Sequence, residues 1–229
     1  PLEYEIGDKG KLVRAILKRI EHACRPGEVP PDDKPCPLHR DVLERYLLLA
    51  NDLPGIKASA VIQPSVTNEA AADLFVTIDE TATSYSASLD NRGSGYVGPL
   101  TAHQSVAFNN LLGLQERTEF HTAQSIPFNE LELVNGVEEI PLTADGLRIA
   151  IDFTHTRSRP GSLLRELNLA TIGDAGAVTL AYPYLRTRSE NLQLRASLGI
   201  GNSATTHGLA DETAFFDQTR TLTLGASYD

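Results

Sequence analysis

Hydrophobic residues follow two different periods along this chain, and the change from one to the other comes near residue 80. Before that point, apolar residues recur at helical spacing in two segments and at alternate positions in three others. The predicted elements are a strand, two helices and two strands, over residues 2–6, 10–24, 38–53, 56–62 and 72–78. Pro54-Gly55 ends the second helix. We therefore expect one small α+β domain over residues 1–80, with two helices on one face of a three-stranded sheet.

From residue 81 onward the pattern has a period of two. About eight strands are predicted, over residues 83–92, 100–112, 114–126, 129–142, 147–154, 176–185, 192–201 and the end of the chain. Strands of about ten residues with one apolar and one polar face have the length and pattern to cross a bilayer at a tilt. We expect residues 81–229 to form the first strands of an antiparallel transmembrane β-barrel. A soluble β-sandwich shows the same alternation and stays open as an alternative.

Two details of this pattern are specific enough to check. Gly113 is interpreted as a near-minimal turn, whereas residues 201–217 are interpreted as a long polar loop. In the strand predicted over residues 129–142, we expect Leu131, Leu133 and Val137 on the apolar face, and Glu130 and Glu132 on the polar face.

The composition limits the possible functions. A formal net charge of −10 and a pI near 5.1 argue against binding to nucleic acid, which requires a basic face. A mean hydropathy of −0.19 does not discriminate, because alternating barrel strands keep the average low. The sequence contains no run of about 18 apolar residues of the kind that forms a transmembrane helix. All lysines precede residue 60, which supports a boundary near residue 80.

Cys24 and Cys36 flank a proline-rich segment. In an oxidising compartment we expect them to form a disulfide that stabilises the fold by roughly 2–3 kcal/mol. The alternative is two unpaired structural thiols. No metal site is expected, because only His22 and His39 lie nearby and their spacing fits no four-ligand zinc pattern.

The candidate catalytic chemistry is weak. His103, His121 and Asp152 fall on polar faces of predicted strands, and a hydrolase would use Ser105 as the nucleophile. Polar residues that line the inside of a barrel explain these positions better, so we expect no enzyme and no catalytic residues. The glycines of residues 93–98 lack the spacing of a phosphate-binding loop, so we expect no nucleotide and no cofactor.

Several motifs occur in an order that resembles a known family. The motifs are Leu43–Ile56, Ala72–Val76, Ser88–Ser94 followed by Gly98-Pro99, Asn109–Leu114, Asp145–Leu147, Ser158–Gly161 and Tyr182–Arg188. The chain resembles two-partner secretion transporters of the outer membrane, of the haemolysin-activator type (ShlB/FhaC/HecB family), over about residues 38–229. The run Leu89, Asp90, Asn91, Arg92 and Gly93 is similar to the motif at the start of the family's barrel.

The resemblance implies a domain organisation. Residues 1–80 would be the last periplasmic POTRA domain, and residues 81–229 the N-terminal part of an outer-membrane β-barrel. A family barrel has sixteen strands, so the chain would be a fragment holding about half of them. The location implied is the outer membrane of a Gram-negative bacterium, with membrane lipid around the barrel and the N-terminal domain in the periplasm.

The resemblance also implies an activity. Such a protein exports one large partner protein that carries a transport domain: the POTRA domain captures the unfolded client and the barrel conducts it. We expect the client to bind by strand addition along Ile56, Ala58, Ala60 and Ile62, although these residues could belong to an ordinary core strand. The alternative functions are an assembly factor for outer-membrane barrels and, from another class, a soluble secreted β-sandwich binding module.

Overall fold

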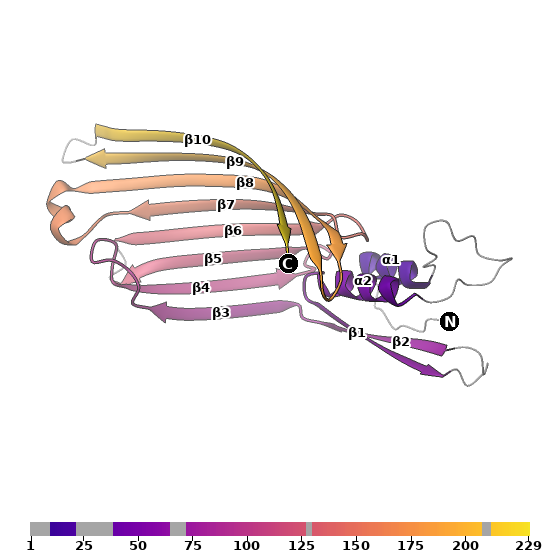
Figure 1. The fold of residues 1–229 in the computed structure, drawn as a ribbon. Helices are drawn as coiled ribbons and strands as arrows, with labels where there is room; N and C mark the ends of the chain where they lie inside the picture. The colour runs from indigo at the N-terminus through magenta and orange to yellow at the C-terminus, as the bar shows by residue number, and fades with distance from the viewer. Residues whose placement is uncertain (1–9, 22–38, 65–71, 127–129, 208–211) are drawn as a thin grey trace.

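The computed structural model describes residues 10–21, 39–64, 72–126, 130–207 and 212–229. The elements in chain order are α1 (Lys11–Glu21), α2 (Arg40–Asn51), β1 (Ile56–Pro64), β2 (Ala72–Glu80), β3 (Thr83–Asp90), β4 (Leu100–Asn109), β5 (Arg117–Ile126), β6 (Leu131–Pro141), β7 (Arg148–Ser158), the 3-10 helix η1 (Ser162–Leu167), β8 (Leu169–Arg186), β9 (Asn191–His207) and β10 (Glu212–Tyr228) (Figure 1). The strand predicted over residues 2–6 and the predicted disulfide between Cys24 and Cys36 lie outside the described residues.

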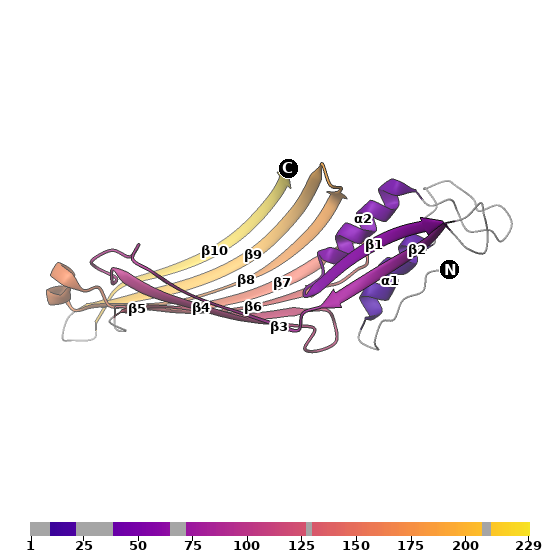
Figure 2. The same ribbon diagram turned by 90° about the horizontal axis from the view of Figure 1, so that it is seen from below.

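The two helices pack against the antiparallel pair β1–β2 (Figure 2). Helix α1 buries Val13, Ile16, Leu17 and Ile20, whose spacing places them on one face of the helix. The rest of the buried cluster comes from the end of α2 and from the two strands: Ala50, Leu53, Ile56, Ala58 and Val76. Each large apolar side chain buried here contributes roughly 1.5–3 kcal/mol. None of the helices in the described part of the chain is both long and apolar enough to cross a membrane.

Strands β3 to β10 form one antiparallel sheet in which each strand pairs with its neighbours in the sequence. The expected antiparallel strands after residue 80 are therefore confirmed. Among the described residues this is a single eight-stranded sheet, not the two packed sheets of a sandwich. Figure 2 shows the sheet strongly curved, with β8, β9 and β10 rising along one side and α2 on the concave side.

The interpretation of residues 201–217 as a long polar loop is wrong. Strand β9 continues to His207, β10 begins at Glu212, and the two pair in register, for example Asn202 with Gln218. Strand β8 also begins at Leu169, seven residues before the predicted start at 176. Apolar and polar residues do not alternate in these strand ends, where, for example, Phe215 and Phe216 are consecutive beside a bulge.

Two further expectations need correction. Gly113 is not a near-minimal turn, because residues 110–116 all lie between β4 and β5. The faces of β6 are also reversed: Leu133 pairs with Ala123 and Thr156, on the same side of the sheet as Ser105, while Glu132 lies on the opposite face. The sequence of β6 shows that its two faces differ. The register of the strand, which the sequence does not give, decides which of them lies on the polar side of the sheet.

Candidate functional site

Most strands of the sheet have polar residues on one face and apolar residues on the other, and β6 is the exception. One cross-strand row consists of Ser86, Ser105, His121, Asn135, Thr154, Ala175, Gly201 and Thr219. The adjacent row, which points to the opposite face, consists of Tyr85, Val106, Phe120, Gly136, Phe153, Gly176, Ile200 and Arg220. Tyr85, Phe153 and Ile200 are 68%, 55% and 59% exposed, so this face of the sheet presents uncovered apolar side chains on β3, β7 and β9.

Side chains on the polar face bind one another across the strands. The hydroxyls of Thr179 and Ser197 are 2.9 Å apart, as are those of Thr171 and Thr205. Closer to the helices, Arg117 donates to Glu119 at 2.9 Å. A face of small hydroxyl side chains with a few paired charges offers hydrogen bonds to water or to a polypeptide without a large apolar surface to hold it.

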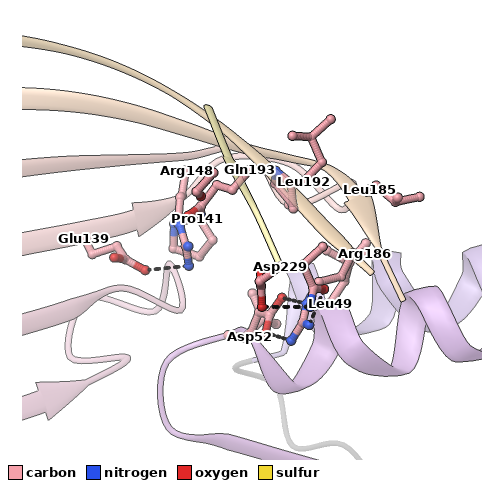
Figure 3. Close-up of a pocket in the computed structure, with 15 residues that line it drawn as sticks. Leu49, Asp52, Glu139, Pro141, Arg148, Leu185, Arg186, Leu192, Gln193 and Asp229 are labelled. Carbon is pink, nitrogen blue, oxygen red and sulfur yellow. Dashed lines mark hydrogen bonds and ion pairs between the residues drawn. The ribbon is translucent and has the colours of Figure 1, made fainter. Parts of the chain in front are cut away.

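Helix α2 lies at one end of this polar face. A cavity of about 250 Å³ separates the helix from the sheet and is shown in Figure 3. Its lining includes Leu49 and Asp52 from the helix side, and Arg148, Gln193 and Ser227 from the polar faces of three strands. The helical domain, which consists of α1, α2, β1 and β2, therefore lies where the polar face ends.

Charged side chains form the junction between the α2 segment and the end of β8. Arg186, at the end of β8, donates to Asp52 through two guanidinium nitrogens at 2.8 and 2.7 Å (Figure 3). Glu44 on α2 accepts the backbone N–H of Arg188 at 2.8 Å. Arg45 donates to the carbonyl oxygen of Pro183 at 3.2 Å. Three residues of one helix segment thus bind the end of β8 and the link that follows it.

A second contact involves the link between β6 and β7. The hydroxyl of Tyr46 donates to Asp145 at 3.2 Å, and burial together with the nearby Asp145 carboxylate raises the pKa of Tyr46. Gly146 has φ +92°, and a Cβ at this position would lie 2.6 Å from Pro183 and 2.7 Å from Leu49. Ala144 packs against the buried cluster of the helical domain. This link is therefore shaped to lie against α2.

The motif Leu89, Asp90, Asn91, Arg92 and Gly93 lies at the opposite end of the sheet, where β3 leaves it. Asp90 accepts the backbone N–H of Arg92 at 3.0 Å, and its other carboxylate oxygen lies 3.0 Å from Nε2 of His103. A Cβ on Gly93 would collide with the carbonyl oxygen of Gly98, which explains the glycine. The motif therefore shapes the loop between β3 and β4.

That loop packs against the next two loops at the same end. Glu130 is 7% exposed and lies 3.4 Å from a guanidinium nitrogen of Arg165, which is in η1. Its backbone oxygen accepts the N–H of Arg159 at 2.9 Å, and the N–H of Gly161 donates to the carbonyl of Tyr96 at 2.6 Å. The loops at this end thus hold one another in place.

The predicted client-binding residues Ile56, Ala58, Ala60 and Ile62 all lie on β1. Ile56 and Ala58 are buried in the helical domain, whereas Ile62 is 53% exposed. Strand β1 pairs with β2 on one side, and no other described strand pairs with it.

The residues considered for a catalytic triad are not arranged as one. Ser105 shares hydrogen bonds with Ser86 and Glu119, while His103 contacts Asp90 and His121 contacts Glu119. Asp152 belongs to β7 and pairs with Val137 and Ala177. No cluster of three or more His, Cys, Asp or Glu side chains that could hold a metal ion occurs among the described residues.

The sequence alone does not predict the junction with α2. Asp52 belongs to the Asn-Asp-Leu-Pro-Gly exit of the helix, and Arg186 to the Tyr-Pro-Tyr-Leu-Arg run. Each residue lies within one of the motifs, but a pair 134 residues apart has no local signal in one sequence.

Compared with known proteins, the sequence matches no family model and no curated protein. Its structure is similar to CdiB from Escherichia coli, with a TM-score of 0.63 and 16% identity over 81% of this chain and 35% of that one. CdiB from Acinetobacter baumannii gives a TM-score of 0.59 and 11% identity over 99% and 41% of the two chains.

A third similar structure is that of BamA from Haemophilus ducreyi lacking POTRA domains 1–3, with a TM-score of 0.52 and 12% identity over 86% of this chain and 39% of that one. At these identities the likeness shows the fold. This chain spans less than half the length of each of the three structures. Its antiparallel sheet therefore matches part of each of these structures.

Proposed function

We propose that this chain is part of an outer-membrane transporter that exports a large partner protein by two-partner secretion. The observation that supports this most is the row from Ser86 to Thr219, which has polar or small residues on all eight strands. It lies beside the row from Tyr85 to Ile200, which has apolar residues or glycine on seven strands. Lipid against the apolar row and a hydrated passage beside the polar row would give each row a matching environment. The ordered motifs of the sequence and the fold likeness to CdiB support the same assignment.

The distribution of apolar residues fits tilted strands. On β4 the outward apolar residues include Ala102, Val106 and Phe108. On β10 they are Leu222, Leu224, Ala226 and Tyr228, with Phe216 separate near the start of the strand. By register, Leu222 lies in the row of Phe108, so the apolar band moves toward the helical end from β4 to β10. Such a shift across hydrogen-bonded rows is what strands inclined to the membrane normal produce.

The long strands fit this arrangement as well. Strands β8, β9 and β10 have 18, 17 and 17 residues. At about 3.3 Å per residue they span roughly 55–60 Å, which exceeds the roughly 30 Å of hydrocarbon even at a 45° tilt. The excess length would project beyond the membrane at the end opposite the helices.

In this proposal residues 1–80 are a periplasmic POTRA-type domain and residues 81–229 are part of the barrel. The domain holds the unfolded client at the mouth, and the polar face conducts it. The client would bind by strand addition to the side of β1 that pairs with no other described strand. It would bind near Ala60 and Ile62, because Ile56 and Ala58 already belong to the domain's core. The protein would bind a secreted partner that carries a transport domain, and outer-membrane lipid would surround its barrel.

An assembly factor for outer-membrane barrels is the second candidate, and the fold likeness to BamA favours it. Deletion of the gene in its own bacterium distinguishes the two. A transporter's loss removes one large protein from the culture medium and leaves the other barrel proteins at normal levels. A general fall in folded barrel proteins would contradict the transporter and support the assembly factor.

A photocrosslinking residue tests the route of the client directly. We expect a crosslinker at Ser105 to capture the exported protein during secretion. The matched control is the next residue, Val106, which points to the opposite face of the same strand and should capture no client. Equal capture at both positions would contradict a passage along the polar face.

A further inference from the structure

The link between β4 and β5 presents three leucines on the end of the sheet nearest the helices. Leu111, Leu112 and Leu114 are 66%, 68% and 54% exposed. Turns that meet water are usually built from polar residues and glycine. A cluster of neighbouring exposed leucines in a single short turn therefore needs an apolar environment to account for it.

The backbone of this turn is held by the side chain of Glu116, which is fully buried. Its two carboxylate oxygens accept the backbone N–H groups of Leu112 and Leu114. Its backbone oxygen accepts the N–H of Asn110 at 2.7 Å, and the Asn110 side chain accepts the N–H of Gln115 at 3.0 Å. Most backbone donors of the turn are thereby satisfied from within.

These contacts give the turn an unusual surface. The one ionisable side chain of residues 110–116 is withdrawn beneath the backbone, and Gln115 is only 1% exposed. What remains outside is mainly leucine. A segment that pairs most of its backbone donors, buries its charge and exposes apolar side chains is suited to contact with hydrocarbon, where unsatisfied polar groups are costly.

We propose that this leucine turn inserts into the membrane leaflet on the side of the helical domain and fixes the depth of the sheet in the bilayer. The inference rests on the proposed membrane location. The turn is continuous with the apolar face, because Phe108, the last outward residue of β4, lies two residues before Asn110. In Figure 2 the link between β4 and β5 lies on the convex side of the sheet, away from α2.

The chain contains no tryptophan, so a single introduced tryptophan reports on its own surroundings. Leu112→Trp is the test variant, reconstituted in vesicles whose phospholipids are brominated near the headgroup end or near the methyl end of the acyl chain. Leu198→Trp, on the outward face of β9, is the control for membrane insertion of the sheet. Ser86→Trp, on the polar face of β3, is the control for a position away from lipid.

We expect bromine near the headgroup to quench Leu112→Trp several-fold more strongly than bromine near the methyl end. Leu198→Trp should be quenched by at least one of the two lipids, and Ser86→Trp by neither. If Leu198→Trp is quenched and Leu112→Trp is not, the leucine turn does not enter the leaflet and the inference fails alone. If Leu198→Trp is also unquenched, the proposed membrane location fails and the inference fails with it.

Discussion

Arg186 and Asp52 are 134 residues apart in the sequence, and two guanidinium nitrogens of Arg186 lie 2.8 and 2.7 Å from the two carboxylate oxygens of Asp52. The third guanidinium nitrogen donates to Asn191 at 2.8 Å, so the whole side chain is fixed. This two-point contact joins the exit of α2 to the end of β8. It sets how the helical domain meets the polar face of the sheet.

The first prediction concerns this pair. Asp52→Asn removes the charge of this side chain and one hydrogen-bond acceptor. We expect α2 to bind the sheet more weakly by roughly 1–2 kcal/mol. The effect is no larger because both side chains are partly exposed and water screens their charges. Hydrogen exchange of the α2 amides should become faster. Glu139→Gln is the control, because its 3.5 Å pair with Arg148 lies within the sheet. Equal acceleration in both variants would show that Asp52 has no special role in docking the helix.

The second prediction compares two glycines with positive φ. A Cβ added at Gly113 (φ +81°) would meet no heavy atom within 4 Å, whereas one added at Gly146 (φ +92°) would lie 2.6 and 2.7 Å from Pro183 and Leu49. Gly113→Ala should cost roughly 1–2 kcal/mol from backbone strain alone. Gly146→Ala adds a steric clash and should cost roughly 3 kcal/mol or more in urea unfolding in detergent. Similar losses in the two variants would contradict tight packing of the β6–β7 link against α2.

The third prediction concerns acid. Burial of Glu116 raises its pKa, but the backbone N–H groups of Leu112 and Leu114 stabilise the carboxylate more, and the net effect lowers the pKa. Because the pKa is lower in the folded state, this stabilisation is fully present above the ordinary Glu pKa of 4.5 and is lost as the pH falls through the lowered value. In detergent-solubilised protein, outside a bilayer, amide exchange of Leu112 and Leu114 should therefore accelerate, relative to the intrinsic rate, as the pH falls below 4.5.

Glu116→Gln is the control for that measurement. The amide keeps one acceptor oxygen but has no charge to lose, so the protection of the two leucine amides should already be low and should change little with pH. If the unmodified protein and the variant show the same pH dependence, another group controls the turn.

The fourth prediction concerns the two faces of β10. Leu222 lies in the outward apolar row and is 68% exposed, while Thr223 pairs with Ser197 on the polar face. Leu222→Arg should destabilise the folded protein in bilayers by roughly 2–4 kcal/mol, whereas Thr223→Arg should change stability little. Equal tolerance of both substitutions would contradict lipid contact along the outward face.

Local pattern is sufficient to predict the helices α1 and α2 and most strands of the sheet. The period of two is clear where one face meets a different environment from the other, as in β7 with Ile149, Ile151 and Phe153. It disappears where residues of one kind are consecutive, as at Thr205-Thr206 and Phe215-Phe216, which is why the paired segments before His207 and after Glu212 resemble a loop in the sequence.

The sequence predicts less of the candidate site than of the fold. The polar face can be anticipated residue by residue, but the expected side for Leu133 is wrong because register, not composition, decides the face of a strand. The contact between Asp52 and Arg186 depends on where β8 ends in space. The role of Glu116 is also hidden, because a glutamate in a turn ordinarily suggests exposure and not a buried hydrogen-bond acceptor.

The most direct test of the account is a cysteine scan along residues 192–200 of β9, in a protein whose Cys24 and Cys36 are replaced by serine and which is assembled in bilayers. A water-soluble maleimide that cannot cross membranes should label the polar-face positions Gln193, Arg195, Ser197 and Gly199 rapidly. It should leave Leu194, Ala196, Leu198 and Ile200 unlabelled, because lipid covers them. Labelling with a period of two is the predicted result. Equal labelling of both sets would contradict a membrane-spanning sheet with a hydrated inner face.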